Sequence, residues 1–366
     1  MIRLAQPFTD DDEALAVREV LESRMLVQGA RVARFEAEVA ARLGDPAPEA
    51  LAVTNGTVAL ELALAVAGVG PGDEVIVPAV SWPSPGHAVI LRGATPVLVD
   101  IDPDTWNLDP ALAAEARTPR TRAVIAIDQF GVAADVPRVR EALPGLAVVE
   151  DAACALGSSL RGVACGALGD VATFSFHPRK VITTGEGGMV TTRDRAWAAR
   201  LRALRNHGQA TPGDFIEAGS NARMSEVQAA IGSAQMAKLD RILARRRELA
   251  ARMRRALSLR WQAAPEGAVV NHQTLGFALP PRGELRGARD ALLAALRADG
   301  VEAGILSYAL HRLPAFARFE ANAARRFPVA EAVVDGGVAV PLHPRMSDDD
   351  ADAVIRSLSR RVGGAL

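Results

Sequence analysis

Short apolar runs alternate with helical patterns through the first half of the chain. Two amphipathic helical patterns open it, over residues 14–23 and 31–43. Behind them, helical segments separate six apolar runs, an order typical of an α/β domain built on a largely parallel sheet. The six runs are residues 51–54, 74–79, 95–101, 123–127, 146–151 and 171–176.

The pattern changes near residue 222. Residues 222–257 predict one long helix or two abutting helices. Shorter strands and helices then alternate, which predicts a compact α+β unit. Its strands are expected at residues 273–279 and 301–306, and its helices at 289–300, 327–336 and 346–361.

Together these patterns predict an α/β fold with two domains. We expect a large domain over residues 1–240, with a mostly parallel central sheet and an N-terminal helical segment, and a small C-terminal α+β domain over residues 241–366. Ser347 and Asp350 have the spacing of a capping box at the start of the last helix.

Composition narrows the class of protein. With 366 residues, 49% of them hydrophobic, the chain can bury a large core. The net charge is -1, so no overall basic field recruits nucleic acid or an anionic membrane. The start of the chain is acidic where a signal peptide would be apolar, and no apolar run reaches the roughly 18 residues that span a bilayer. We therefore expect a cytoplasmic protein.

Two further groups of residues have simple interpretations. Cys154 and Cys165 are too few for a disulfide framework and have no zinc-site spacing, so we expect free thiols and no metal. The basic run Arg245–Arg255 lies in the long predicted helix, where it is expected to form a solvated face with acidic partners rather than a phosphate site.

Lys180 is the most informative residue of the chain. It lies in a polar, glycine-rich turn between two apolar β-type runs, in the stretch FSFHPRKVITTGEGGMVTT. An isolated lysine in a hairpin is usually exposed. A lysine held against a buried pocket instead has a lowered pKa, which frees the neutral amine that attacks a carbonyl. Ser175, five residues earlier, can offer its hydroxyl to a phosphate.

Other polar residues fall at the ends of predicted strands, where ligands bind in parallel sheets. Asp151 ends one strand, Asn55–Thr57 follow another and precede a helix, and Trp82 follows a third. Each has an ordinary alternative: Asp151 as a helix cap, Asn55–Thr57 as a turn, and Trp82 as a core residue. In combination they match the needs of pyridoxal phosphate: an amine, a carboxylate for its ring nitrogen, N–H donors for its phosphate and a flat group against its ring.

Motifs along nearly the whole chain resemble the DegT/StrS group of fold-type I pyridoxal phosphate enzymes, which aminate mainly keto-sugar nucleotides and keto-cyclitols. The resemblance is specific for the family and much less so for the substrate. The motifs are LVQGARVARFE, VTNGTVALELAL, GPGDEVIVPAVSW, GATPVLVDID, EDAACALGS, FSFHPRKVITTGEGGMVTT, GSNARMSEVQAAIG and VAVPLHPRMSDDD.

The resemblance implies a role for each site residue. Lys180 would hold the cofactor covalently and shuttle the proton during transfer, and Asp151 would pair with the pyridine nitrogen. Trp82 would stack on the ring. Gly56, Thr57 and Ser175 would hold the phosphate of the same subunit.

The resemblance also implies a homodimer with shared active sites. Asn221 matches an asparagine that reaches the phosphate of the neighbouring subunit. Near the substrate, only Tyr308 and His311 are expected as contacts, and a structural role for His311 is the alternative.

Two residues depart from the family pattern. Cys154, near the cofactor ring, replaces a histidine or glutamine of many relatives, and its hydrogen bond would be weaker. Asp128 replaces a common histidine. Because of these two departures, the resemblance predicts amino transfer more firmly than it predicts which sugar is bound.

The expected function is transfer of an amino group from glutamate or glutamine to a keto-sugar nucleotide, with a keto-cyclitol as the alternative acceptor. A sugar dehydratase of the same fold needs a histidine in place of Lys180. A non-enzymatic regulator would need a damaged pocket or a DNA-binding appendage, and the sequence has neither.

Overall fold

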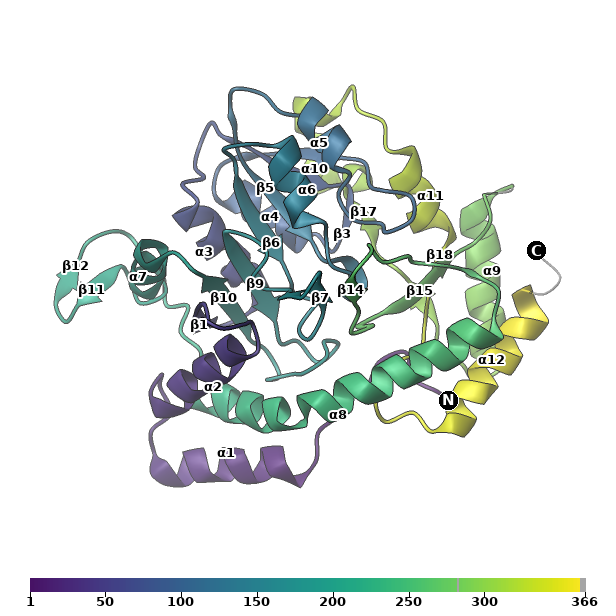
Figure 1. The fold of residues 1–366 in the computed structure, drawn as a ribbon, viewed down its shortest axis with the longest axis horizontal. Helices are drawn as coiled ribbons and strands as arrows, with labels where there is room; N and C mark the ends of the chain where they lie inside the picture. Colours follow the sequence, from purple (N-terminus) through teal and green to yellow (C-terminus); the bar gives the residue numbers. More distant parts are fainter. Residues whose placement is uncertain (282, 363–366) are drawn as a thin grey trace.

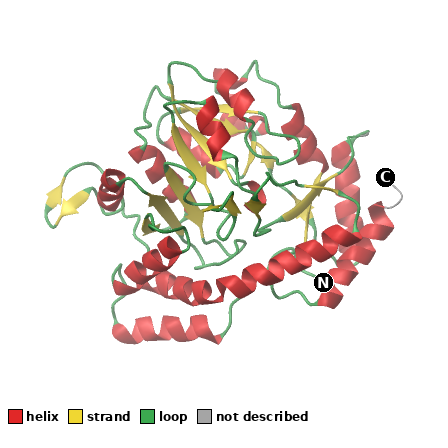
Figure 2. Ribbon diagram, viewed as in Figure 1, coloured by secondary structure: helices red, strands yellow, loops and turns green. Residues whose placement is uncertain are grey.

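A seven-stranded sheet forms the centre of the computed structural model, which describes residues 1–281 and 283–362 (Figures 1 and 2). Five neighbouring strands are parallel, and two further strands are added at one edge by antiparallel pairing. The mostly parallel sheet expected from the sequence is confirmed. In spatial order the strands are β1 (Glu49–Val53), β10 (Gly188–Thr192), β9 (Val171–Ser175), β6 (Ala147–Asp151), β5 (Thr121–Ile127), β2 (Glu74–Pro78) and β4 (Thr95–Val99).

Both faces of this sheet are buried, which explains why its strands are continuous apolar runs. Successive residues of a strand point to opposite faces, so Leu51 and Val53 join one core while Ala50 and Ala52 join another. Helices cover the two faces and supply the rest of each core. These helices are α2 (Ala30–Ala41), α3 (Gly56–Val66), α4 (Ser84–Leu91), α5 (Pro110–Glu115), α6 (Val136–Ala142) and α7 (Arg195–Leu204).

One helix, α8 (Glu226–Ala256), runs along the molecule and joins the central sheet to the C-terminal elements (Figure 1). Leu239 and Ile242 pack in a core of the central sheet, whereas Leu249 and Met253 pack in the C-terminal core. Of the two possibilities left by the sequence, the single long helix is therefore correct. The division into domains at residue 240 stays a prediction, and that residue lies inside α8.

The C-terminal elements form a second, four-stranded antiparallel sheet backed by helices. The expected capping box is confirmed, because the Asp350 N–H donates to Ser347 Oγ and the Ser347 N–H to Asp350 Oδ2. The elements are β13 (Arg260–Trp261), β15 (Leu275–Ala278), β18 (Gly337–Val340), β16 (Gly304–Ile305), α9 (Leu285–Ala298) and α12 (Asp348–Val362). Two further helices, α10 (Pro314–Ala317) and α11 (Pro328–Gly336), pack their buried side chains in a core of the central sheet.

Among the described residues, short strands form three small sheets outside the two main sheets. The hairpin β11–β12 projects from the body beside α7 (Figure 1). The side chains of Phe215 in β12 and of Ile216 just after it are exposed. None of the described helices is both long and apolar enough to cross a membrane. The short strands are β3 (Val80–Ser81), β7 (Ser159–Leu160), β8 (Val163–Ala164), β11 (Gln209–Thr211), β12 (Asp214–Phe215), β14 (Ala268–Val269) and β17 (Tyr308–Ala309).

The basic run in α8 differs from the solvated face expected of it. Arg245 and Arg252 do form ion pairs with Asp348 and Asp352 of α12. Arg246, however, is buried, and its guanidinium donates to the carbonyl oxygens of His272 and Gln273. Burial lowers the pKa of Arg246 to about 10. The expectation was wrong for Arg246 because loop 270–274 covers that side of the helix.

The N-terminal helices are anchored to α8 by buried charge. Glu226, almost fully buried at the start of α8, accepts hydrogen bonds from the N–H groups of Gly29, Arg31 and Val32 at 2.8–2.9 Å. These are first-turn donors of α2, which has no side-chain cap of its own. Helix α1 (Asp11–Ser23) lies alongside α8 (Figure 1) and is held there by ion pairs to Lys238.

We expect Glu226→Ala to lower the free energy of unfolding by about 3 kcal/mol, because it leaves three helix-terminal N–H groups without their charged acceptor. Urea unfolding followed by circular dichroism measures this change. Glu22→Ala is the matched control, since Glu22 is exposed on α1. Equal unfolding midpoints for the two variants would show that Glu226 is not an anchor.

Candidate active site

Lys180 lies in the connection between β9 and β10, as the sequence predicts, and this connection is an ordered turn. The Lys180 N–H donates to the carbonyl of His177 at 2.8 Å, and the Thr184 N–H donates to that of Phe176 at 3.0 Å. Gly185 has φ 83°, a left-handed conformation that favours glycine. The backbone therefore fixes where the Lys180 side chain starts.

Two side chains from other elements hold this turn in place. The Gln273 amide donates to the carbonyl of Arg179 at 2.8 Å, and Gln235 of α8 accepts from the Thr183 N–H at 3.3 Å. The turn thus contacts the C-terminal half of the chain as well as the central sheet.

The amine of Lys180 points to the carboxyl end of β6. Its Nζ lies 3.1 Å from Cys154 Sγ, and Asp151, the last residue of β6, is buried nearby. Burial raises the pKa of Asp151, while the charge of Lys180 and the N–H of Ala153 act in the opposite direction. A cation that approaches Asp151 therefore gains a strong electrostatic interaction.

Lys180 is also one of only two lysines in the chain, although lysine and arginine together number 42. The other, Lys238, is buried against Asp10, Asp12 and Glu13. Burial acts against its charged form, but the hydrogen bonds with these carboxylates raise its pKa overall. Lys238 is therefore held as a charged ammonium, which leaves Lys180 as the lysine suited to attack a carbonyl.

The start of α3 offers an anion site beside the Lys180 turn. Asn55 caps the helix by accepting from the Val58 N–H at 2.9 Å. The N–H groups of Gly56 and Thr57 belong to the first turn of the helix, where no intrahelical acceptor exists, and no acceptor for them is found among the described residues. Ser175, at the end of β9, packs so closely that a Cβ at Gly56 would lie 2.9 Å from Ser175 Cβ. This close approach explains the glycine.

Trp82 and Tyr308 form an aromatic pair at the rim of this region. The strands β3 and β17 place Ser81 opposite Tyr308, and the two rings meet edge to face with centroids 5.6 Å apart. Trp82 is 60% exposed, so its alternative interpretation as a core residue is wrong. An indole exposed to this extent can offer surface to a planar ligand.

Asn221 and His311 lie outside the contacts around Lys180. Asn221 is exposed, and the carbonyl of its neighbour Ala222 accepts from the Thr54 N–H at 3.1 Å. The His311 ring stacks on Phe327 at 4.3 Å, and its Nε2 lies 3.0 Å from Glu331 Oε1. These contacts favour the structural role for His311, and its role toward substrate stays a prediction.

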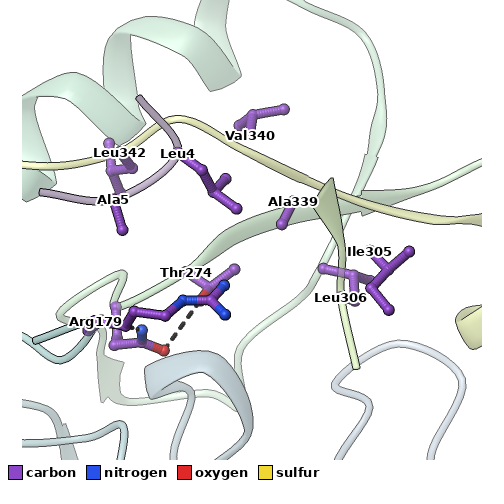
Figure 3. Close-up of a pocket in the computed structure, with 10 residues that line it drawn as sticks. Leu4, Ala5, Arg179, Thr274, Ile305, Leu306, Ala339, Val340 and Leu342 are labelled. Carbon is purple, nitrogen blue, oxygen red and sulfur yellow. Dashed lines mark hydrogen bonds between the residues drawn. The ribbon is translucent and has the colours of Figure 1, made fainter. Parts of the chain in front are cut away.

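Figure 3 shows a narrow cleft next to this site, where the Arg179 side chain extends toward Thr274. Its volume of about 30 Å³ is room for water but not for a sugar. The remaining lining residues include Leu4, Ala5, Gln273, Ile305, Leu306, Ala339, Val340 and Leu342.

Sequence reasoning missed two supporting residues. Ser84, at the start of α4, shares a 2.9 Å hydrogen bond with Thr57 Oγ1, and Gln273 holds the carbonyl of Arg179. Serine and glutamine are common in loops, so neither carried a signal. The scarcity of lysine, in contrast, was visible in the sequence and singles out Lys180.

The groups gathered here fit pyridoxal phosphate. Two free N–H groups at a helix start and a serine hydroxyl suit a phosphate, and a buried carboxylate suits a protonated ring nitrogen. An exposed indole suits the ring face, and a lysine amine suits the aldehyde. The fold and site thus define a pyridoxal phosphate-dependent transferase.

Comparison with known proteins gives the same class. The model of the DegT/DnrJ/EryC1/StrS aminotransferase family matches residues 7–359. GDP-perosamine synthase of Caulobacter vibrioides is 37% identical, over 98% of both chains. A dTDP-4-dehydro-2,3,6-trideoxy-D-glucose 4-aminotransferase of Saccharopolyspora spinosa is 33% identical, over 99% of this chain and 97% of that protein.

A solved structure agrees along the whole length. That of 3-amino-5-hydroxybenzoic acid synthase has a TM-score of 0.91 and 35% identity, and it covers 99% of this chain and 98% of that one. The chain belongs to the DegT/DnrJ/EryC1/StrS aminotransferase family. It is an aminotransferase, and family membership implies pyridoxal phosphate as its cofactor.

We expect borohydride reduction of the loaded protein to fix a pyridoxyl group on Lys180 and on no other residue, which peptide mapping tests. Lys180→Arg should abolish the label because it keeps the charge but removes the amine. Lys238→Arg, which retains a partner for Asp10 and Glu13, should leave the label unchanged. A label on Lys238 would refute the assignment.

Proposed function

We propose that the protein moves an amino group from L-glutamate or L-glutamine to the ketone of a sugar nucleotide, with pyridoxal phosphate bound covalently to Lys180. The observation that carries the proposal is the position of the Lys180 amine, which lies 3.1 Å from Cys154 Sγ and near enough to buried Asp151 for its charge to act on the pKa of that carboxyl. Two relatives named for GDP- and dTDP-linked sugars support the acceptor class.

Bound pyridoxal phosphate would supply an electron sink for the electrons released when a proton leaves the substrate carbon. Asp151 would keep the ring nitrogen protonated through its negative charge. The Lys180 amine would take the proton from the substrate carbon and return it to the cofactor carbon, acting as base and then as acid.

The remaining residues would bind and orient the cofactor. The N–H groups of Gly56 and Thr57 and the hydroxyl of Ser175 would hold the phosphate, and Trp82 would stack on the ring. Cys154 would lie near the ring oxygen, where a thiol is a weak hydrogen-bond partner. Its 3.1 Å contact with Lys180 Nζ supports a position close to the reacting atoms.

The acceptor would enter from the rim where Tyr308 meets Trp82. A keto-cyclitol is the alternative acceptor. The similarity to an enzyme named for 3-amino-5-hydroxybenzoic acid, a ring without a nucleotide in its name, supports keeping this alternative. A dehydratase is disfavoured because Lys180 occupies the position where that class needs histidine.

A homodimer in the cytoplasm, with Asn221 reaching the phosphate in the neighbouring subunit, is part of the proposal. The exposed side chain of Asn221 is available for such a contact, and its backbone lies beside the segment that leads into α3. Exposed apolar side chains at Met25, Val27 and Phe215 support an interface between subunits.

We expect glutamate or glutamine alone to bleach the yellow colour of the loaded protein, because one pocket serves donor and acceptor in turn. A panel of keto-sugar nucleotides and keto-cyclitols, added after removal of the donor, should then identify the acceptor by return of the colour. Single-turnover absorption spectra measure both halves. Bleaching by a sugar nucleotide alone, with every amino acid inactive, would mean elimination rather than amino transfer.

The shared site predicts complementation between two inactive variants. Lys180→Ala removes the amine, and Asn221→Asp adds a charge that repels the phosphate. In a mixed dimer both lesions fall in one site and the other site is intact, so mixing should restore up to about half of the activity per dimer. Inactivity after demonstrated subunit exchange would reject the shared site.

A further inference from the structure

A second group of ionisable residues lies directly behind Asp151, on the other side of the sheet. Glu150 precedes Asp151 on β6 and therefore points to the opposite face. Asp128 follows the end of β5, and Cys165 lies in the loop after β8. The ligand atoms of these three residues all lie within 4.8 Å of one another, and all three side chains are buried.

Hydrogen bonds assign different protonation states to the two carboxyls. Glu150 accepts three: from the N–H of Gly166 at 2.6 Å, and from Leu168 and Gly169 at 2.8 and 2.9 Å. Asp128 accepts one, from the N–H of Ala134 at 2.8 Å, and its buried Oδ2 receives none from the described residues. Three N–H donors favour the charged form of Glu150.

Neither carboxylate has a cationic partner among the ion pairs of the described residues. Two adjacent negative charges in a buried site repel strongly, so only one of the two groups can be ionised. Burial, followed by the charge of Glu150, raises the pKa of Asp128 well above its usual range. Burial also raises the pKa of Glu150, but the N–H groups of Gly166, Gly169 and Leu168 oppose that shift.

The location links this pair to the cofactor site. The Asp128 N–H donates to the carbonyl of Asp151 at 3.0 Å, and its side chain faces Glu150, the residue before Asp151. Glu150 in turn fixes loop 166–169 through its three N–H contacts. The end of β6 is thus tied on both sides of the residue that would face the cofactor ring.

We propose that Asp128 is a positioning residue for Asp151, kept as a neutral acid that donates its proton to the Glu150 carboxylate. The positioning part rests on the proposed role of Asp151 toward the cofactor. The shared proton itself is a property of the folded chain and does not depend on that role.

An asymmetric pair of amide substitutions tests the protonation state. Asp128→Asn keeps an N–H donor toward Glu150 and an oxygen toward Ala134, so the melting temperature should change by less than about 2 °C. Glu150→Gln turns an NH2 group against backbone N–H donors and should lower the melting temperature by more than about 5 °C. Equal losses would overturn the assignment.

Asp100→Asn is the matched control. Asp100 is buried, and its carboxyl accepts hydrogen bonds from the N–H groups of Ile101, Val329 and Ala330. This substitution should destabilise the protein as Glu150→Gln does. A stable Asp128→Asn beside a destabilised Asp100→Asn would show that the amide is accepted at position 128 because Asp128 is already protonated. It would also show that the protein does not accept an amide at every buried carboxyl.

Infrared difference spectroscopy on protein labelled with carbon-13 at aspartate carboxyls gives a direct readout. A band from a protonated, buried carboxyl should be present at neutral pH and absent in Asp128→Asn. The band should persist in Lys180→Arg, so failure of the proposed function would leave this result untouched. Absence of the band would contradict a proton shared between Asp128 and Glu150. The same holds for one metal ion per chain in the native protein, because the ion would take the place of that proton.

Affinity for pyridoxal phosphate tests the positioning role. Asp128→Ala removes the donor to Glu150 and should raise the dissociation constant about tenfold, whereas Asp128→Asn should restore it to within about threefold of the wild type. Fluorescence titration of the protein without cofactor measures both. An unchanged dissociation constant for Asp128→Ala would overturn the positioning role while leaving the infrared result intact.

Discussion

Burial of the Asp151 carboxylate is the constraint on which the site depends. A charge removed from water at the end of β6 is costly unless something positive stands beside it. The Lys180 amine meets part of this need, and a protonated ring nitrogen would meet the rest. The surrounding structure serves to keep these groups in place: the turn after β9 fixes the lysine, and the backbone contact from Asp128 fixes the strand end.

The turn that carries Lys180 is held by contacts from both the central sheet region and the C-terminal part of the chain. Helix α8 contributes Gln235 to the Lys180 turn from its first half and packs in the C-terminal core with its second half. Gln273 reaches the same turn from the C-terminal part. A change in how the two cores pack on α8 would therefore alter the position of the turn that carries Lys180.

The sequence predicted well those features that depend on neighbouring residues, such as strands, helices and turns. Apolar runs with alternating helices identified the strands of the central sheet, and glycines around Lys180 identified its turn. Asp151 was found because it ends an apolar run, a position that a parallel sheet brings to its binding edge.

Features that depend on distant partners could not be read from local patterns. Arg245 and Arg246 look alike in the sequence, yet one faces α12 and the other is covered by loop 270–274. Helix α6 and the first residues of β6 separate Asp128 from Glu150 along the chain, so only the folded sheet brings their carboxyls together. The contact between the rings of Trp82 and Tyr308 likewise joins residues that lie far apart along the chain.

The near absence of lysine has a consequence for the chemical selectivity of the whole surface. Aldehydes and reactive ketones combine with primary amines, and on most proteins they scatter over many surface lysines. Here guanidinium groups provide almost all of the side-chain cations, and the one other lysine is enclosed by carboxylates. Apart from the amine at the start of the chain, Lys180 is the one primary amine that is not enclosed by carboxylates. The composition of the chain therefore favours reaction of a carbonyl compound at this single side chain.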